Sequence, residues 1–154
     1  MGEKVDYLVG GIGTGGTMSG AGKYLKEKNP YIKIIAVDPE GSVFYDYFET
    51  GKLIKPHVYK VEGIGEDYLV KAVDFDLLDG IIQVGDRDSF LMTRKLAREE
   101  GIFAGGSSGS AVWAAIQIAQ DMKEGENIVV ILPDSGSRYM SKVYDDGWMK
   151  ANGF

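Results

Sequence analysis

The sequence contains no cysteine and only one histidine, His57, among its 154 residues. Without cysteine, the chain has neither a disulfide framework nor a thiolate metal site. With a single histidine, neither a histidine metal cluster nor a Ser-His-Asp triad is expected. We therefore predict no metal site in this chain, and we expect His57 to be a solvated loop residue rather than a ligand.

Long apolar runs and basic clusters are missing as well. No stretch is long and apolar enough to span a membrane, and no signal peptide opens the chain. The formal net charge is −6, without a basic stripe, so nucleic acid is not an expected partner. We therefore expect a cytoplasmic protein that binds neither membranes nor nucleic acid.

Glycine, by contrast, is abundant: the chain has 22, about twice the average share. An apolar run, Tyr7–Val9, is followed at once by a cluster of five, Gly10, Gly11, Gly13, Gly15 and Gly16. A helix-like stretch, 18–28, comes next. Because glycine has no Cβ atom, a ligand can approach the main chain of this segment closely. The N–H groups at a helix start attract phosphate. Thr14 and Thr17 can add hydroxyl donors. We interpret this segment as a phosphate-binding loop; the alternative is a tight turn that needs glycine only for its geometry.

Short apolar segments alternate with helix-like segments along the whole chain. The expected strands cover 7–9, 32–37, 80–84 and 127–132, and the expected helices cover 18–28, 43–49, 89–100, 111–122 and 138–144. This order, with strands buried on both faces, is typical of a mainly parallel sheet with helices on both faces. We predict a three-layer α/β fold in which residues 1–154 form a single domain.

Two further loops rich in glycine or serine accompany the later elements. Gly105–Ser110 precedes the expected helix 111–122, and Asp134–Ser137 follows the expected strand 127–132. The carboxyl ends of buried strands are where α/β proteins place ligand contacts. We therefore expect both loops to converge with Gly11–Thr17 on one edge of the sheet. For Gly105–Ser110, a capped helix start without a ligand is an equally good interpretation.

The first loop also fits the dinucleotide-binding pattern G-x-G-x-x-G, through Gly11, Gly13 and Gly16. Asp38 closes the next expected strand, about where an acid that binds ribose would lie. This motif and Asp38, taken alone, favour a nicotinamide or flavin dinucleotide site. That interpretation gives no particular role to the other two loops.

Four separated motifs resemble those of one enzyme family. They are Gly13–Thr17 (GTGGT), Lys60–Gly65 (KVEGIG), Gly105–Ala111 (GGSSGSA) and Leu132–Met140 (LPDSGSRYM). The first resembles the phosphate-binding loop of fold-type II pyridoxal-phosphate enzymes, and the others resemble segments of the cystathionine β-synthases. The resemblance runs in order along essentially the whole chain. The related cysteine synthases share the first motif, but the second and fourth look closer to cystathionine β-synthase.

The resemblance implies that the chain helps to bind pyridoxal 5′-phosphate. The residues that would hold its phosphate are Gly13, Thr14, Gly15, Gly16 and Thr17. Ser135 would form a hydrogen bond with the pyridine nitrogen, and Gly63, Ile64 and Gly65 would line the cleft for cofactor and substrate. The implied activity is that of a β-replacing lyase of transsulfuration and cysteine biosynthesis, with serine and homocysteine as its amino-acid substrates.

The chain departs from the family pattern in one large respect. In the family, the Schiff-base lysine lies in an N-terminal half, upstream of a phosphate loop like this one. Here the loop begins by residue 13, and Lys4, the only lysine before it, lacks the family's lysine context. We therefore expect the C-terminal part of a catalytic core, with no catalytic residue of its own and inactive alone.

The missing N-terminal half is the expected partner of this chain, and we expect the parent enzyme to be a homodimer. Two alternatives stay open. One is a cysteine synthase-like enzyme, and the other is a non-catalytic fragment that binds phosphate or packs against a partner.

Overall fold

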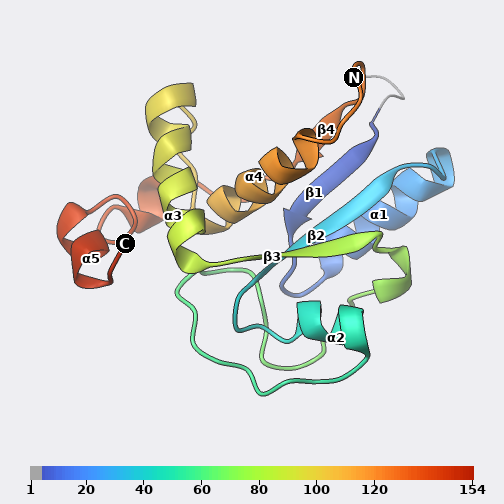
Figure 1. Cartoon of the computed structure of the whole chain (residues 1–154), viewed down its shortest axis with the longest axis horizontal. Coiled ribbons are helices and arrows are strands. Elements are labelled where there is room, and N and C mark those ends of the chain that lie inside the picture. The colour runs from blue at the N-terminus through green and yellow to red at the C-terminus, as the bar shows by residue number, and fades with distance from the viewer. Residues whose placement is uncertain (1–4) are drawn as a thin grey trace.

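The computed structural model describes residues 5–154, in which four strands form one sheet (Figure 1). The strands are β1 (Tyr7–Gly11), β2 (Lys33–Pro39), β3 (Gly80–Val84) and β4 (Ile128–Val130), in the spatial order β3-β2-β1-β4. All three pairings are parallel. The predicted parallel sheet is therefore confirmed, and each strand overlaps a segment that was expected from its apolar run.

Strand β4 is shorter than the segment 127–132 expected from the sequence. Its ladder with β1 ends at the pair Val9 and Val130, after which the N–H of Ile131 donates to the carbonyl oxygen of Val9 at 2.9 Å. Residues 132–137 then leave the sheet at its carboxyl edge. The end of this ladder frees the loop that contains Ser135.

Five α-helices accompany the sheet. They are α1 (Gly16–Lys28), α2 (Phe44–Thr50), α3 (Asp86–Lys95), α4 (Gly106–Ala119) and α5 (Asp146–Ala151). A π-helical turn, Leu96–Glu100, continues α3, and short 3₁₀ turns cover Phe75–Leu77 and Gly136–Tyr139. Within residues 5–154, no helix is both long and apolar enough to cross a membrane.

Helices cover both faces of the sheet, as predicted. Successive residues of a strand point to opposite faces. Leu8 of β1 packs in a cluster with Met18 of α1 and Phe44 of α2, whereas its neighbour Val9 packs with Ala114 of α4. The three-layer α/β architecture is confirmed, and α1 and α4 lie on opposite faces of the same strand.

Helix α4 begins at Gly106 rather than at residue 111, because its first turns form a packing surface. A Cβ atom on Gly109 would overlap the carbonyl oxygen of Ser89 and Oγ1 of Thr93 in α3. Only glycine permits this close approach of α3 and α4. Intrinsic propensity disfavours a helix start rich in glycine and serine, so tertiary packing decides this boundary.

The C-terminal segment differs most from expectation. The helix predicted over 138–144 is wrong, since only the 3₁₀ turn and further turns occupy this region. Helix α5 follows instead, and its start is stabilised because the Asp145 carboxylate accepts from the N–H of Trp148 at 2.6 Å. Trp148 and Phe154 both pack with Phe90 of α3. These aromatic rings therefore dock the tail on α3.

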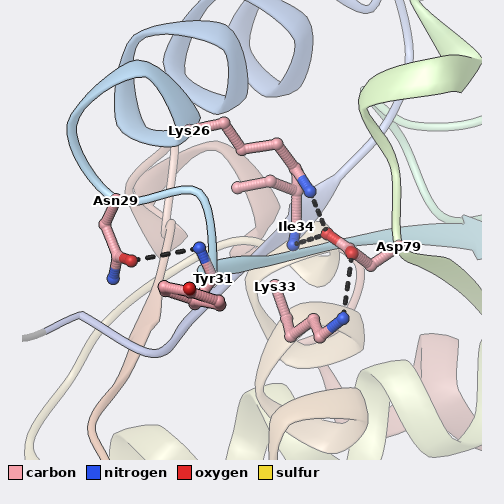
Figure 2. A network of polar contacts seen from close by, with 6 residues as sticks. All are labelled: Lys26, Asn29, Tyr31, Lys33, Ile34 and Asp79. Atoms are coloured by element: carbon pink, nitrogen blue, oxygen red, sulfur yellow. Dashed lines mark hydrogen bonds and ion pairs between the residues drawn. The ribbon is translucent and has the colours of Figure 1, made fainter.

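Asp79, just before β3, connects three elements (Figure 2). Its carboxylate accepts from the backbone N–H of Ile34 in β2 at 2.8 Å, from Lys26 Nζ of α1 at 2.7 Å and from Lys33 Nζ at 3.2 Å. Burial opposes the charged carboxylate, but these three bonds outweigh it, so the pKa of Asp79 is lowered. The network fixes α1, β2 and β3 to one another away from the carboxyl edge of the sheet.

Candidate functional site

The chain reverses its progress across the sheet between β1 and β4. From β1 it proceeds to β2 and β3 on one side, and it then returns to place β4 on the other side of β1 (Figure 1). In open parallel sheets, ligands bind outside the carboxyl ends of the strands at such a switch point. The loops there are Gly11–Thr17 after β1 and 131–137 after β4. Two of the three expected ligand loops therefore flank the switch point.

The first loop presents an open helix start. Gly15 is the N-cap of α1, with a left-handed φ of 83°, and no side chain caps the helix. The first turn of α1 carries no acidic residue, so no carboxylate of the helix itself competes for its free N–H groups. Thr14, Gly16 and Thr17 are exposed, and a Cβ atom on Gly16 would meet nothing within 4 Å. This arrangement has the donors and the space that a phosphate group requires.

The segment 63–65 packs against the first loop. A Cβ atom on Gly13 would lie 3.0 Å from the carbonyl oxygen of Gly63, and one on Gly11 would overlap Cγ2 of Ile64. The N–H of Gly65 donates to the carbonyl oxygen of Ile12 at 2.7 Å. The structure therefore brings Gly63 and Gly65 beside the glycine loop. The side chain of Ile64 is buried in this contact, so Ile64 supports the loop as packing.

Asp86 holds this segment in place, a role that the sequence did not reveal. Its carboxylate accepts from the backbone N–H of Lys60 at 2.8 Å and from that of Val61 at 2.9 Å. Asp86 is the first residue of α3; the N-cap of this helix is Gly85, and no side chain caps it. The available signal was an acid two residues after a predicted strand, because such a residue stands at the carboxyl edge of the sheet with the other loops.

Ser135 lies in the loop that follows β4. Its Oγ accepts from the backbone N–H of Ser137 at 3.3 Å and so caps the 3₁₀ turn Gly136–Tyr139. Accepting this bond occupies an oxygen lone pair and leaves the hydroxyl proton free to donate. Ser135 is also exposed. It can therefore offer one neutral hydrogen-bond donor to a ligand at the switch point.

The loop Gly105–Ser110 reaches the same edge but is buried rather than open. Ala104 forms an isolated antiparallel bridge with Ser135, and the N–H of Gly105 donates to the carbonyl oxygen of Asp134 at 3.3 Å. Ser110 Oγ donates to Ser89 Oγ at 2.7 Å, which ties the loop to α3. The second loop thus supports the third, and its residues pack against protein instead of facing solvent.

Asp38 is not available to bind the ribose of a dinucleotide. It is fully buried, and its Oδ2 accepts from the N–H of Tyr45 in α2 at 3.0 Å. Burial raises the pKa of Asp38 to about 6. The dinucleotide interpretation therefore loses the acid on which it depended. His57 is exposed in a loop, as expected, and Lys4 lies outside the described residues.

We expected no metal site in this chain. Among residues 5–154, no group of three or more His, Asp or Glu side chains is arranged to hold a metal ion. The hydrogen-bond donors at the switch point suit an anion instead.

Comparison with known proteins gives the site a family context. Residues 1–134 match the family model described as "Pyridoxal-phosphate dependent enzyme". A cystathionine β-synthase of Rattus norvegicus is 48% identical over 151 residues, which cover 98% of this chain and 27% of that protein. A cysteine synthase of Staphylococcus aureus (strain N315) is 42% identical over 140 residues, which cover 91% of this chain and 43% of that protein.

A solved structure agrees with these sequence matches. The crystal structure of an O-acetylserine dependent cystathionine β-synthase from Helicobacter pylori superposes with a TM-score of 0.79 at 39% identity. The match covers 92% of this chain and 44% of that chain. The chain thus spans less than half the length of each of these relatives. The resemblance inferred from the four motifs is confirmed, and relatives of both enzyme kinds match.

Proposed function

The chain belongs to the pyridoxal-phosphate dependent enzymes, and from this premise we propose that it binds pyridoxal 5′-phosphate at the switch point between β1 and β4. In this proposal the phosphate is held by Gly13, Thr14, Gly15, Gly16 and Thr17. Ser135 forms a hydrogen bond with the pyridine nitrogen, and Gly63, Ile64 and Gly65 form the neighbouring wall. The observation that carries the proposal is the open, uncapped N-terminus of α1.

Phosphate binding is the main contribution of this chain. Hydrogen bonds from N–H groups to a charged group contribute about 1.5–3 kcal/mol each, and the helix N-terminus adds about 0.3–1 kcal/mol. Thr14 and Thr17 can each donate a further hydroxyl proton. Because the donors are fixed in a glycine loop and a helix start, little order is lost when the ligand binds.

Ser135 sets the electronic character of the site. A neutral hydroxyl donates to the ring nitrogen but, unlike a carboxylate, does not enforce a protonated ring. The bound cofactor supplies an electron sink, and this sink is weaker when the ring is unprotonated. Such a site favours elimination and replacement at the β-carbon over wider carbanion chemistry.

The parent reaction that we propose is β-replacement, in which the thiol of homocysteine replaces the hydroxyl of serine. The resemblance of Lys60–Gly65 and Leu132–Met140 to cystathionine β-synthases supports this choice. A cysteine synthase-like reaction is the second candidate, because relatives of that name match 91% of this chain. The third is a non-catalytic fragment that binds phosphate or packs against a partner.

We further propose that residues 1–154 form one part of a larger catalytic unit and are inactive alone. In the resembling enzymes, the lysine that holds the cofactor lies upstream of the phosphate loop. The coverage of 27% to 44% in relatives supports this division. A homodimeric parent and a cytoplasmic location belong to the same proposal.

Ligand titration of the chain tests the proposal. Pyridoxal 5′-phosphate should bind reversibly and compete with inorganic phosphate, whereas NAD should not displace either ligand. Borohydride reduction should leave no adduct at one defined lysine. Competition by NAD would favour the dinucleotide interpretation, and a single reducible lysine would contradict the proposed inactivity.

A further inference from the structure

A carboxyl–phenol pair lies directly beside Ser135. Asp134 Oδ2 accepts from the hydroxyl of Tyr139 at 2.6 Å. The other carboxyl oxygen, Oδ1, is buried and has no hydrogen-bond partner among the described residues. A buried polar atom without a partner is costly, so the position of Asp134 requires an explanation beyond its bond with Tyr139.

The pair packs against the backbone of Gly105. A Cβ atom there would overlap Asp134 Oδ1 and lie 2.6 Å from Cε2 of Tyr139. The N–H of Gly105 also donates to the carbonyl oxygen of Asp134 at 3.3 Å. Asp134 is thus held at three points: by its side chain, by its main chain and by close contact.

The residues on either side of Ser135 are fixed as firmly. Ser135 pairs with Ala104, and the N–H of Gly136 donates to the carbonyl oxygen of Phe103 at 3.0 Å. The hydroxyl of Tyr144 donates to the carbonyl oxygen of Ala104 at 2.7 Å. The Ser135 side chain itself has one long bond, from the N–H of Ser137 at 3.3 Å. Its direction therefore depends on how well its backbone is held.

We propose that Asp134 and Tyr139 are positioning residues that fix the Cα–Cβ direction of Ser135, so that its hydroxyl points to the ring of the bound cofactor. This inference rests on the function proposed above. Burial and the bond to Asp134 raise the pKa of Tyr139 to about 12. The phenol therefore stays protonated and keeps donating at every pH at which the protein would work.

Different segments would hold the phosphate and the ring of the ligand. The phosphate loop follows β1, whereas Asp134 and Tyr139 follow β4. Loosening the pair should weaken contact with the ring and leave contact with phosphate unchanged. Pyridoxine 5′-phosphate is the suitable probe because it has the ring and the phosphate but no aldehyde, so it cannot react with lysines.

The experiment measures the Kd of pyridoxine 5′-phosphate and of inorganic phosphate for the unsubstituted chain, Asp134→Asn and Tyr139→Phe. We expect each substitution to weaken binding of the first ligand roughly 3- to 10-fold, the effect of one lost neutral hydrogen bond. Phosphate binding should not change, which also reports that the variants are folded. In both variants, the ultraviolet spectrum of bound pyridoxine 5′-phosphate should lie closer to that of the free ligand than it does in the unsubstituted chain.

Ser135→Ala supplies the decisive comparison. If Asp134 acts through Ser135, the double variant should bind pyridoxine 5′-phosphate no more weakly than Ser135→Ala alone. Asp121→Asn, an exposed acid after α4 with the same charge change, is the matched control and should bind as the unsubstituted chain does. Unchanged ring binding in Asp134→Asn and Tyr139→Phe, or losses that multiply in the double variant, would overturn the inference. An unsubstituted chain that binds phosphate but not pyridoxine 5′-phosphate would instead overturn the proposed function.

Discussion

Individual glycines in the first loop have different tasks, although the sequence presents them as one cluster. Gly15 has a positive φ, and a Cβ atom on it would lie 2.9 Å from the backbone nitrogen of Val73. Its replacement would strain the fold itself. Gly16 borders open space at the start of α1. Substitution at Gly16 therefore tests ligand approach without disturbing a packed contact.

Gly16→Val should weaken binding of inorganic phosphate at least about tenfold. A side chain at this position separates the N–H donors from the phosphate and so removes hydrogen bonds to a charged group. Gly20→Val is the matched control. Gly20 lies one turn later in α1, and a Cβ atom there also meets nothing within 4 Å. Equilibrium dialysis with labelled phosphate measures both variants. Equal Kd values for the two would show that the start of α1 is not the phosphate site.

Asp38 allows a prediction about pH. Its pKa in the folded chain is about 6, against 3.8 as the ordinary value. Between these values the folded chain binds a proton that the unfolded chain has released, so the contribution of Asp38 to stability falls as pH rises through this window. The loss amounts to about 3 kcal/mol. Asp38→Asn, which keeps an acceptor for the N–H of Tyr45, should remove this dependence.

Urea unfolding from pH 4 to pH 7 provides the measurement. The free energy of unfolding of the variant, minus that of the unsubstituted chain, should increase by about 2–2.5 kcal/mol across this range, which covers most of the titration. A flat difference would mean that Asp38 titrates at its ordinary pKa despite its burial.

Among the elements, the connection between α1, β2 and β3 depends on Asp79 (Figure 2). Its pKa is lowered, so its contribution to stability is present above pH 3.8 and is lost as pH falls through the folded-state pKa. Asp79→Asn keeps an acceptor for the N–H of Ile34 but loses its attraction to Lys26 and Lys33. Because the Asp79 side chain is 19% exposed, we expect a loss of only about 1–2 kcal/mol at pH 7.

Chemical denaturation at pH 7 checks this value. Asp146→Asn is the matched control, because the carboxylate of Asp146 pairs with Arg94 but is exposed to solvent. The free energy of unfolding of the Asp146→Asn variant should equal that of the unsubstituted chain. A loss in Asp79→Asn no larger than in this control would show that the network does not stabilise the fold.

Helices and strands that are determined by neighbouring residues in the sequence were predictable from it. The apolar run at Tyr7–Val9, followed by glycines, indicated a strand, a loop and a helix, and β1 and α1 occupy those places. The start of α4 was not predictable in the same way. It depends on the close contact of Gly109 with Ser89 and Thr93, which only the packed structure contains.

The same distinction applies to the candidate site. Gly16 and Ser135 stand in local motifs, so their loops could be proposed from the sequence. The acceptor role of Asp86 was missed because its donors, Lys60 and Val61, lie 26 and 25 residues earlier in the chain. The packing of Asp134 against Gly105 was missed as well, because this contact exists only where the two loops meet in the folded chain.

Across the whole molecule, the loops of the proposed site form one connected series of contacts. Gly13 packs against Gly63, and Val61 lies 4.0 Å from a Cβ placed on Gly106. The next residue back, Gly105, donates to Asp134. A segment that docks at this edge would therefore meet loops that are already held in place, and association should require little rearrangement of this chain.

A complementation experiment tests docking at this edge. The N-terminal half of a related enzyme, which carries the lysine that holds the cofactor, is mixed with this chain and pyridoxal 5′-phosphate. We expect β-replacement with homocysteine only in the mixture, and assays with serine and with O-acetylserine distinguish the two leaving groups. In the mixture, Ser135→Ala should lower turnover roughly 5- to 150-fold, since one unsatisfied hydrogen-bond partner costs about 1–3 kcal/mol.

Two variants make the result specific to the site. Ser135→Asp should lower turnover further, because a carboxylate favours a protonated ring and redistributes its electron density. Gly20→Val should leave turnover unchanged, since Gly20 lies on α1 beyond the phosphate loop. If both Ser135 variants react as fast as the unsubstituted mixture, Ser135 does not contact the ring. If the mixture instead binds NAD and transfers hydride, the loop serves a dinucleotide, and the β-replacement proposal fails.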